Sequence, residues 1–99
     1  MYIGTMKVYL ILRQSRSLKD KRQVVSSIKE KLQQSFNISI AEVDLLDDRQ
    51  QAVLGIAMVS NEMGHLQAAL QKILDALRSH PVAELGRHES HVEAAILGE

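Results

Sequence analysis

Apolar and polar residues alternate along the first segment of the chain. Over residues 2–13 one strand face is apolar at every second position, and this period of two predicts a half-buried β-strand; the face comprises Met6, Val8, Leu10 and Leu12. Apolar residues then recur at helical spacing behind Ser17, a good N-cap, with Asp20 three residues later. The pattern predicts a helix that begins after Ser17 and ends near residue 35.

Two further strands are predicted in the middle of the chain. The apolar phase shifts within residues 36–45, which predicts a strand with a bulge at Ala41 or Glu42. Residues 52–59 are apolar on both faces, as a central strand covered on both sides would be. The polar residues 47–51 predict the connection between these strands.

A second helix and an edge strand complete the predicted elements. Ser60 or Asn61 is expected to cap the helix, whose apolar stripe ends before Pro81. Residues 82–92 are polar and predict a strand suited to a sheet edge. The order βαββαβ with right-handed crossovers predicts an α+β fold of the split βαβ type. Its four-stranded antiparallel sheet would carry both helices on one face, with the first and third strands in the centre.

The sheet face opposite the helices is predicted to be apolar. Its apolar set is Ile3, Tyr9, Ile11, Val53, Ala57 and Val59. A patch of this kind usually marks an interaction surface, so a homodimer or another partner is expected on this face. The alternative is a tolerated patch, interrupted by Thr5 and Lys7, because protein surfaces carry much apolar area.

Composition narrows the chemistry and the compartment. The 99 residues contain no cysteine, which excludes disulfides, thiolate metal ligands and cysteine nucleophiles. No apolar run reaches the roughly 18 residues that a membrane helix needs, and the first segment lacks the small-residue cleavage site of a secretory signal. The sequence therefore predicts one domain spanning residues 1–99, located in the cytoplasm.

The charges are balanced overall but segregated along the chain. Lys and Arg number 12, as do Asp and Glu, so an overall electrostatic signature of nucleic-acid binding is missing. Residues 1–35, however, hold eight Lys or Arg against Asp20 and Glu30 alone. The first third of the chain is basic, and the remainder is acidic by the same amount.

The start of the first predicted helix is the most distinctive motif. It reads Ser-Leu-Lys-Asp-Lys-Arg over residues 17–22, and it resembles the helix start of the YlxP-like family of small uncharacterised bacterial proteins. The resemblance continues through Phe36, Ala41-Glu42-Val43-Asp44, Val53-Leu54-Gly55 and Val59-Ser60-Asn61, and so covers nearly the whole chain. It implies a ferredoxin-like βαββαβ fold and, from the neighbourhood of the family's genes, a role near RNA in ribosome maturation or translation. It implies no catalytic residue.

Cations crowd the same helix start. Positive charge is disfavoured at a helix N-terminus, by about 0.3–1 kcal/mol for each exposed cation. A local rule broken in this way often accompanies function, and backbone N–H groups beside Lys and Arg would suit a phosphate. Anion or RNA-backbone contact is therefore assigned to Arg13, Arg16, Lys19 and Arg22. In the competing interpretation these cations are neutralised by acids that the fold brings to the same end, Asp44, Asp47 and Asp48.

Lys21 is predicted to face a different side of the helix from the other cations. At about 100° per residue it lies between Ile28 and Leu32, on the core face of the helix. A lysine there would pack its stem against the sheet and direct its ammonium to a carboxylate. Glu42, at the expected bulge, is the predicted partner, which makes this ion pair architectural.

The other candidate chemistries are weaker. His88 and His91 would face opposite sides of a strand, so no metal site is predicted, and His80 is interpreted as a cationic partner of the helix C-terminus. No nucleophile elbow or Gly-rich phosphate loop is present, so neither catalysis nor a cofactor is expected. Base stacking on the sheet is disfavoured because residues 52–59 contain no aromatic and Tyr9 alone makes a poor platform.

The sequence therefore predicts a noncatalytic, dimeric accessory protein that contacts RNA or a ribonucleoprotein through the basic helix start. The alternative is a small-molecule-sensing or protein-interaction dimer. That alternative depends on fold analogy, because ferredoxin-like modules often bind ligands between subunits.

Overall fold

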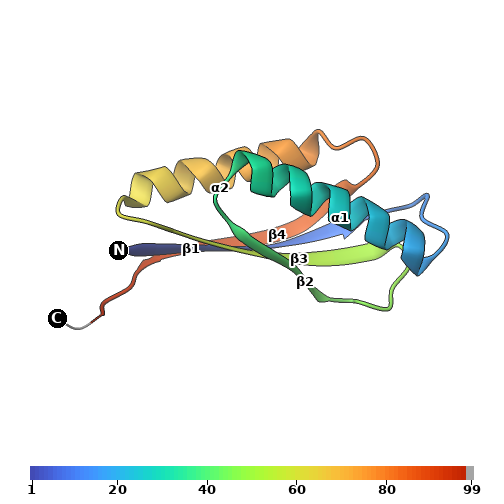
Figure 1. The fold of residues 1–99 in the computed structure, drawn as a ribbon, viewed down its shortest axis with the longest axis horizontal. Helices are drawn as coiled ribbons and strands as arrows, with labels where there is room; N and C mark the ends of the chain where they lie inside the picture. Colours follow the sequence, from blue (N-terminus) through green and yellow to red (C-terminus); the bar gives the residue numbers. More distant parts are fainter. Residues whose placement is uncertain (98–99) are drawn as a thin grey trace.

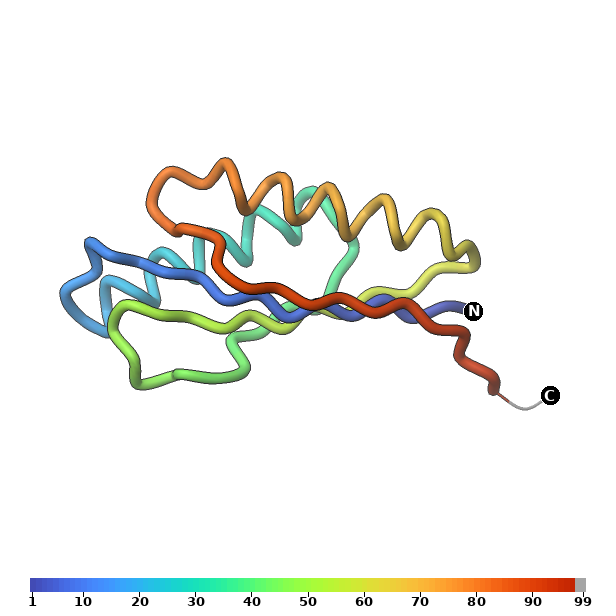
Figure 2. The backbone as a smooth tube through the Cα atoms, turned by 180° about the vertical axis from the view of Figure 1, so that it is seen from behind, coloured from blue at the N-terminus to red at the C-terminus, as the bar shows by residue number. Residues whose placement is uncertain are grey.

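The backbone follows the predicted βαββαβ order over residues 1–97, which the computed structural model describes. The elements are β1 (Tyr2–Ile11), α1 (Leu18–Ser35), β2 (Ser39–Asp44), β3 (Gln51–Ser60), α2 (Met63–Arg78) and β4 (Glu84–Ala94). All neighbouring strands pair antiparallel, in the order β2-β3-β1-β4. Both helices lie on one face of the sheet and leave the opposite face open (Figure 1, Figure 2). The ferredoxin-like split βαβ fold is confirmed.

The core lies between the sheet and the two helices. The predicted apolar face of β1 is buried, since none of its four side chains is more than 3% exposed. It meets the apolar stripes of the helices, which are Val25, Ile28 and Leu32 on α1 and Leu66, Leu70, Ile73 and Leu77 on α2. Removal of this apolar surface from water, at about 25 cal/mol per Å², is the main force that holds the helices on the sheet.

The bulge in β2 lies at Val43, slightly later than the sequence predicts. The register of β2 against β3 shifts between Glu42 and Asp44. Glu42 pairs with Leu54 and its side chain faces the core. The alternation of core-facing and open-facing side chains therefore continues as far as residue 42, where the core-facing side chain is a carboxylate. The alternation of apolar residues in the sequence therefore shifts before residue 43, where the strand register shifts.

The start of α2 also differs from the prediction. The N-cap is Glu62, not Ser60 or Asn61, and its side chain makes no capping hydrogen bond. The Ser60 hydroxyl instead accepts a hydrogen bond from the Glu62 backbone N–H at 3.1 Å, which stabilises the turn out of β3. The sequence signal at Ser60 thus belongs to the turn, three residues before the helix begins.

Among the described residues, neither helix combines the length and the apolar character that a membrane crossing requires.

Candidate nucleic-acid interface

The Lys21 side chain is buried under the loop between β2 and β3. It is 0% exposed, and its Nζ donates to the backbone carbonyls of Leu45, Leu46 and Gln51 at 2.9, 3.3 and 3.1 Å. An ammonium has three N–H groups, so these carbonyls take all of them. Lys21 thus ties the first turn of α1 to the β2–β3 loop.

The structure places Glu42 beside this ammonium, as predicted from the core-facing position of Lys21 and the place of Glu42 in β2. Its Oε2 lies 2.9 Å from Lys21 Nζ but accepts no hydrogen bond within the described chain. The contact is therefore ionic, because the three lysine protons point to carbonyl oxygens. Leu45 adopts a left-handed backbone with φ of 54°, which is unusual for a leucine, and its carbonyl is one of the three that Lys21 holds.

The exposed start of α1 is capped by its own residues. Asp20 N–H donates to the Ser17 hydroxyl at 3.0 Å, as the capping pattern predicts, and Asp20 Oδ2 accepts from the Arg16 backbone N–H at 3.0 Å. The reciprocal bond of this capping box thus reaches one residue further back than usual. The Arg16 and Asp20 N–H groups at this end therefore have acceptors within the chain.

Gln50 links the loop before α1 to the loop before β3. The Gln50 side-chain amide donates to the carbonyls of Arg13 and Ser15 at 3.1 and 3.3 Å, and the Gln50 backbone carbonyl accepts from the Leu12 backbone N–H at 2.7 Å. Together with Lys21, these bonds make one end of the molecule a rigid unit of two loops and a helix start.

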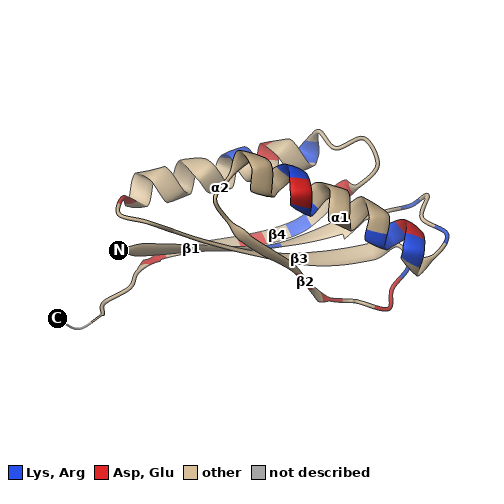
Figure 3. Cartoon of the chain, in the orientation of Figure 1, with Lys and Arg blue, Asp and Glu red and all other residues tan. Residues whose placement is uncertain are grey.

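Arg16, Lys19 and Arg22 are exposed on this unit and form no ion pair with any carboxylate within residues 1–97. We call these three residues, with Arg13, the basic helix start. Figure 3 shows basic residues at the start of α1 and in the loop before it, and acidic residues in the β2–β3 loop.

The acids expected to neutralise these cations are engaged by their own loop. Asp44 Oδ1 accepts from Leu45 N–H, and Asp48 Oδ1 accepts from the N–H groups of Gln50 and Gln51. Asp44 and Asp48 therefore shape the loop, and within residues 1–97 neither they nor Asp47 form an ion pair with the helix start.

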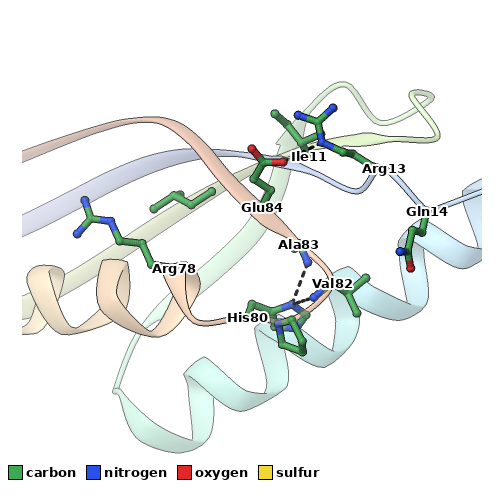
Figure 4. A pocket seen from close by; sticks show the side chains of 10 residues that line it. Ile11, Arg13, Gln14, Arg78, His80, Val82, Ala83 and Glu84 are labelled. Carbon is green, nitrogen blue, oxygen red and sulfur yellow. Dashed lines mark hydrogen bonds and ion pairs between the residues drawn. The ribbon is translucent and has the colours of Figure 1, made fainter.

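Arg13 differs from the other three cations because its Nε donates to Glu84 Oε2 at 2.9 Å. Both side chains are more than half exposed, so this pair contributes little to stability. They line a depression of about 410 Å³ between the ends of β1 and α2, together with Arg78 and His80 (Figure 4).

His80 does not act as a cationic partner of the α2 C-terminus. Its Nδ1 accepts hydrogen bonds from the backbone N–H groups of Val82 and Ala83 at 3.2 and 3.0 Å (Figure 4), which requires an unprotonated Nδ1. Burial, and secondly the charge of Lys31, lower the pKa of His80. The expectation of a dipole partner was wrong because the chain folds back over the ring after α2.

The two histidines of β4 point to different faces of the sheet. His88 lies opposite Val8, on the helix side, and His91 lies opposite Thr5, on the open side. Within residues 1–97 no group of three or more His, Asp or Glu side chains is arranged to hold a metal ion.

The open sheet face is less uniform than the sequence suggests. Val53 is fully buried within a single chain, between its partners Tyr9 on β1 and Asp44 on β2, so it offers no area to a partner. Val59 is 62% exposed and Ala57 is also exposed. Among the predicted residues, Ile3, Tyr9 and Ile11 are partly exposed.

One end of this face carries a feature that the sequence interpretation missed. Arg87 stacks on Tyr9, with its guanidinium carbon 4.4 Å from the ring centroid, and Lys7 Nζ lies 5.5 Å from the same centroid. The sequence signal was Gly86, because an isolated glycine in a strand often marks a bulge or a close backbone approach.

Comparison with known proteins gives the family. The model of the family described as "Protein of unknown function (DUF503)" matches residues 3–90, from β1 into β4. The chain belongs to the DUF503 family. A relative of this DUF503 chain, the "Uncharacterized protein YlxP" of Bacillus subtilis (strain 168), is 35% identical over 82 residues, which cover 83% of this chain and 89% of the relative. The resemblance drawn from the helix-start motif is confirmed.

Solved structures share the fold of this DUF503 member at low identity. A de novo designed protein, Foldit4, is 10% identical with a TM-score of 0.54, over 97% of this chain and all of that chain. A mutant chlorite dismutase from Candidatus Nitrospira defluvii is 13% identical with a TM-score of 0.56, over 96% of this chain and 41% of that chain. These likenesses show the architecture alone.

Proposed function

We propose that this protein is a noncatalytic accessory protein that contacts RNA backbone, free or within a ribonucleoprotein, through the basic helix start. The observation that carries the proposal is the set of three exposed cations, Arg16, Lys19 and Arg22, that have no ion-pair partner within residues 1–97. Cations left without carboxylates are available to phosphates, and phosphate contact supplies most of the affinity in nonspecific nucleic-acid binding.

The rigidity of this end supports the proposal. The β1–α1 loop is fixed by Gln50, the β2–β3 loop by Lys21, and the helix start by Ser17 and Asp20. A surface held in this way loses little conformational entropy when a ligand binds, so more of the interaction energy remains as affinity.

The neighbouring acids favour one direction of approach. Asp47 and Asp48 lie in the β2–β3 loop and Asp44 ends β2, whereas the cations lie in the β1–α1 loop and within the first five residues of α1 (Figure 3). A polyanion would be repelled from the acidic loop and attracted to the helix start. We therefore expect contact along the β1–α1 side of this end.

A salt titration of RNA binding tests the proposal. Binding of a short RNA should weaken steeply with salt, and Lys19→Glu should weaken it further and reduce the salt slope by about one. Lys31→Glu is the matched control, because Lys31 is an exposed lysine nearer the other end of the same helix. The proposal fails if no RNA binds at low salt, or if Lys31→Glu has the same effect as Lys19→Glu.

The same titration separates the alternative function. A small-molecule-sensing dimer would bind an uncharged ligand with an affinity that neither salt nor Arg16→Glu changes. Fold analogy supports that alternative, whereas the unpaired cations support RNA contact.

We also propose that the protein forms a homodimer through the apolar end of the open face. The support is the exposure of Val59 and Ala57 near Ile3 on the paired strands β1 and β3. Because Val53 is buried, the exposed aliphatic area of the predicted dimer face lies at the end formed by Ile3, Ala57 and Val59, and at Ile11.

A further inference from the structure

A bulge in β4 brings Arg87 over Tyr9. Val8 pairs with His88 but Leu10 pairs with Leu85, so two residues of β4, Gly86 and Arg87, stand opposite one residue of β1, Tyr9. A bulge bends the strand and redirects side chains, and bulges are frequent beside functional sites.

Glycine is favoured at the bulge by a close backbone approach. A Cβ atom at residue 86 would lie 3.2 Å from the Tyr9 carbonyl oxygen, which is closer than nine in ten such contacts. A side chain there would require the two strands to separate by a few tenths of an ångström at the position where Arg87 meets the ring. The stacking of Arg87 on Tyr9 is thus built into the backbone of the sheet.

The Tyr9 ring is flanked by cations that have no acidic partner. Neither Arg87 nor Lys7 forms an ion pair with a carboxylate in the part of the chain that the structure describes. Contacts with Arg87, which have the larger effect, and with Lys7 lower the pKa of Tyr9. An aromatic ring between two unpaired cations presents both a stacking surface and positive charge.

These groups border a depression of about 740 Å³ on the open face. It is lined by Tyr9, Arg87, Ile11, Arg13, Gln50 and Gln51, with Leu10. The lining combines two guanidinium groups, two amide side chains and an aromatic ring. Amides and guanidinium groups can bond base edges and phosphates, and aromatic rings and guanidinium planes stack on bases.

We infer that this depression holds one nucleotide of a single-stranded RNA, with the base stacked on the Tyr9–Arg87 pair and the adjoining phosphates near Lys7 and Arg13. The inference rests on the proposed function and specifies the class of RNA. A duplex hides its base faces, so it would use the basic helix start but not this depression.

Arg13 connects the two sites. It belongs to the basic helix start and also lines the depression, and its carbonyl is held by Gln50, another lining residue. A single strand could therefore run from the first turn of α1, past Arg13, to the open face of the sheet. From the sequence, Tyr9 as a lone aromatic makes a poor platform; the bulge in β4 adds the Arg87 guanidinium to it.

Tyrosine fluorescence provides a direct test. The chain has two tyrosines and no tryptophan, so Tyr2→Phe leaves Tyr9 as the single emitter. In this background, a short oligoadenylate should lower Tyr9 emission, whereas an RNA duplex of equal length should bind without doing so.

Affinity measurements on variants complete the test. Tyr9→Leu and Arg87→Gln should each weaken oligoadenylate binding about fivefold or more and leave duplex binding unchanged. Arg78→Gln is the matched control, because Arg78 is an exposed arginine at the end of α2 and does not line this depression. Circular dichroism establishes that each variant keeps the native secondary structure.

The outcomes distinguish this inference from the proposed function. If Tyr9→Leu and Arg87→Gln bind oligoadenylate as the parent does and Tyr9 emission stays constant, the inference is wrong, while an effect of Lys19→Glu would still support RNA contact. If AMP alone lowers the emission at the concentrations where oligoadenylate does, the depression is a mononucleotide site and the RNA assignment is wrong. If no RNA binds, both proposals fail together.

Discussion

Lys21 Nζ lies 2.9 Å from Glu42 Oε2 inside the protein, although the two residues belong to a helix and to an edge strand. The lysine is fully buried and the glutamate side chain is 15% exposed. A buried charge of this kind is tolerated only when its partners are complete, and here three carbonyls complete them.

Removal of the ammonium should therefore be costly. Lys21→Met leaves the Glu42 carboxylate and three partly buried carbonyls without their cation, and should lower the free energy of unfolding by about 3–5 kcal/mol. Urea denaturation measures the change. Lys19→Met, on the exposed side of the same turn, should change stability by less than about 0.5 kcal/mol. Equal losses in the two variants would contradict the architectural role of Lys21.

The helix cap makes a second prediction. Ser17→Ala removes the acceptor of the Asp20 N–H and should destabilise the protein by about 1 kcal/mol. Ser26→Ala, at an exposed position inside α1, is the comparison and should be neutral or slightly stabilising, because alanine has the higher helix propensity. Thermal or urea unfolding of both variants checks the difference, and a harmless Ser17→Ala would rule out the cap as a determinant of stability.

His80 should make stability depend on pH. Its pKa is lowered from the ordinary 6.5, so the unfolded chain binds its proton first as pH falls. The stability that the neutral ring contributes is complete above pH 6.5 and is lost as pH falls towards the lowered pKa. His80→Ala should flatten the stability profile in this window, whereas His65→Ala, at an exposed site on α2, should not. Superimposable profiles of His80→Ala and the parent would refute this assignment.

The dimer interface can be tested by charge. Val59→Lys places an ammonium in the apolar end of the open face and should shift the species seen in sedimentation velocity to monomer. Val82→Lys is the control, because Val82 is 47% exposed in the loop before β4, away from that surface. An unchanged sedimentation profile for Val59→Lys would count against this interface.

The sequence predicted the architecture well because most of it follows from periodicity. The alternation of β1, the helical stripe of α1 and the break before Pro81 are local signals, and all three elements have the expected extent within about two residues. The position of Lys21 on the core face followed from the same helical period. The prediction of Glu42 as the partner of Lys21 needed, in addition, only the topology of the sheet.

The parts that were missed depend on contacts between distant segments. Arg87 stands over Tyr9 because of a bulge in a strand 78 positions further along the chain, and a polar strand gives no register signal. The burial of Val53 and the inward turn of His80 likewise arise from neighbouring strands and loops. The sequence also could not show that Arg16 and Lys19 have no ion-pair partner within residues 1–97, because this depends on the hydrogen bonds that Asp44 and Asp48 form within their own loop.

The three carbonyls around Lys21 bear on how sequences of relatives should be compared. An invariant lysine in the middle of a basic motif would ordinarily be counted as ligand-binding. At residue 21 its retention would report selection for a correctly closed loop, since neither an arginine fork nor an uncharged chain supplies three compact donors. Variation at Lys19 and Arg22, not at Lys21, is the better record of what this surface touches.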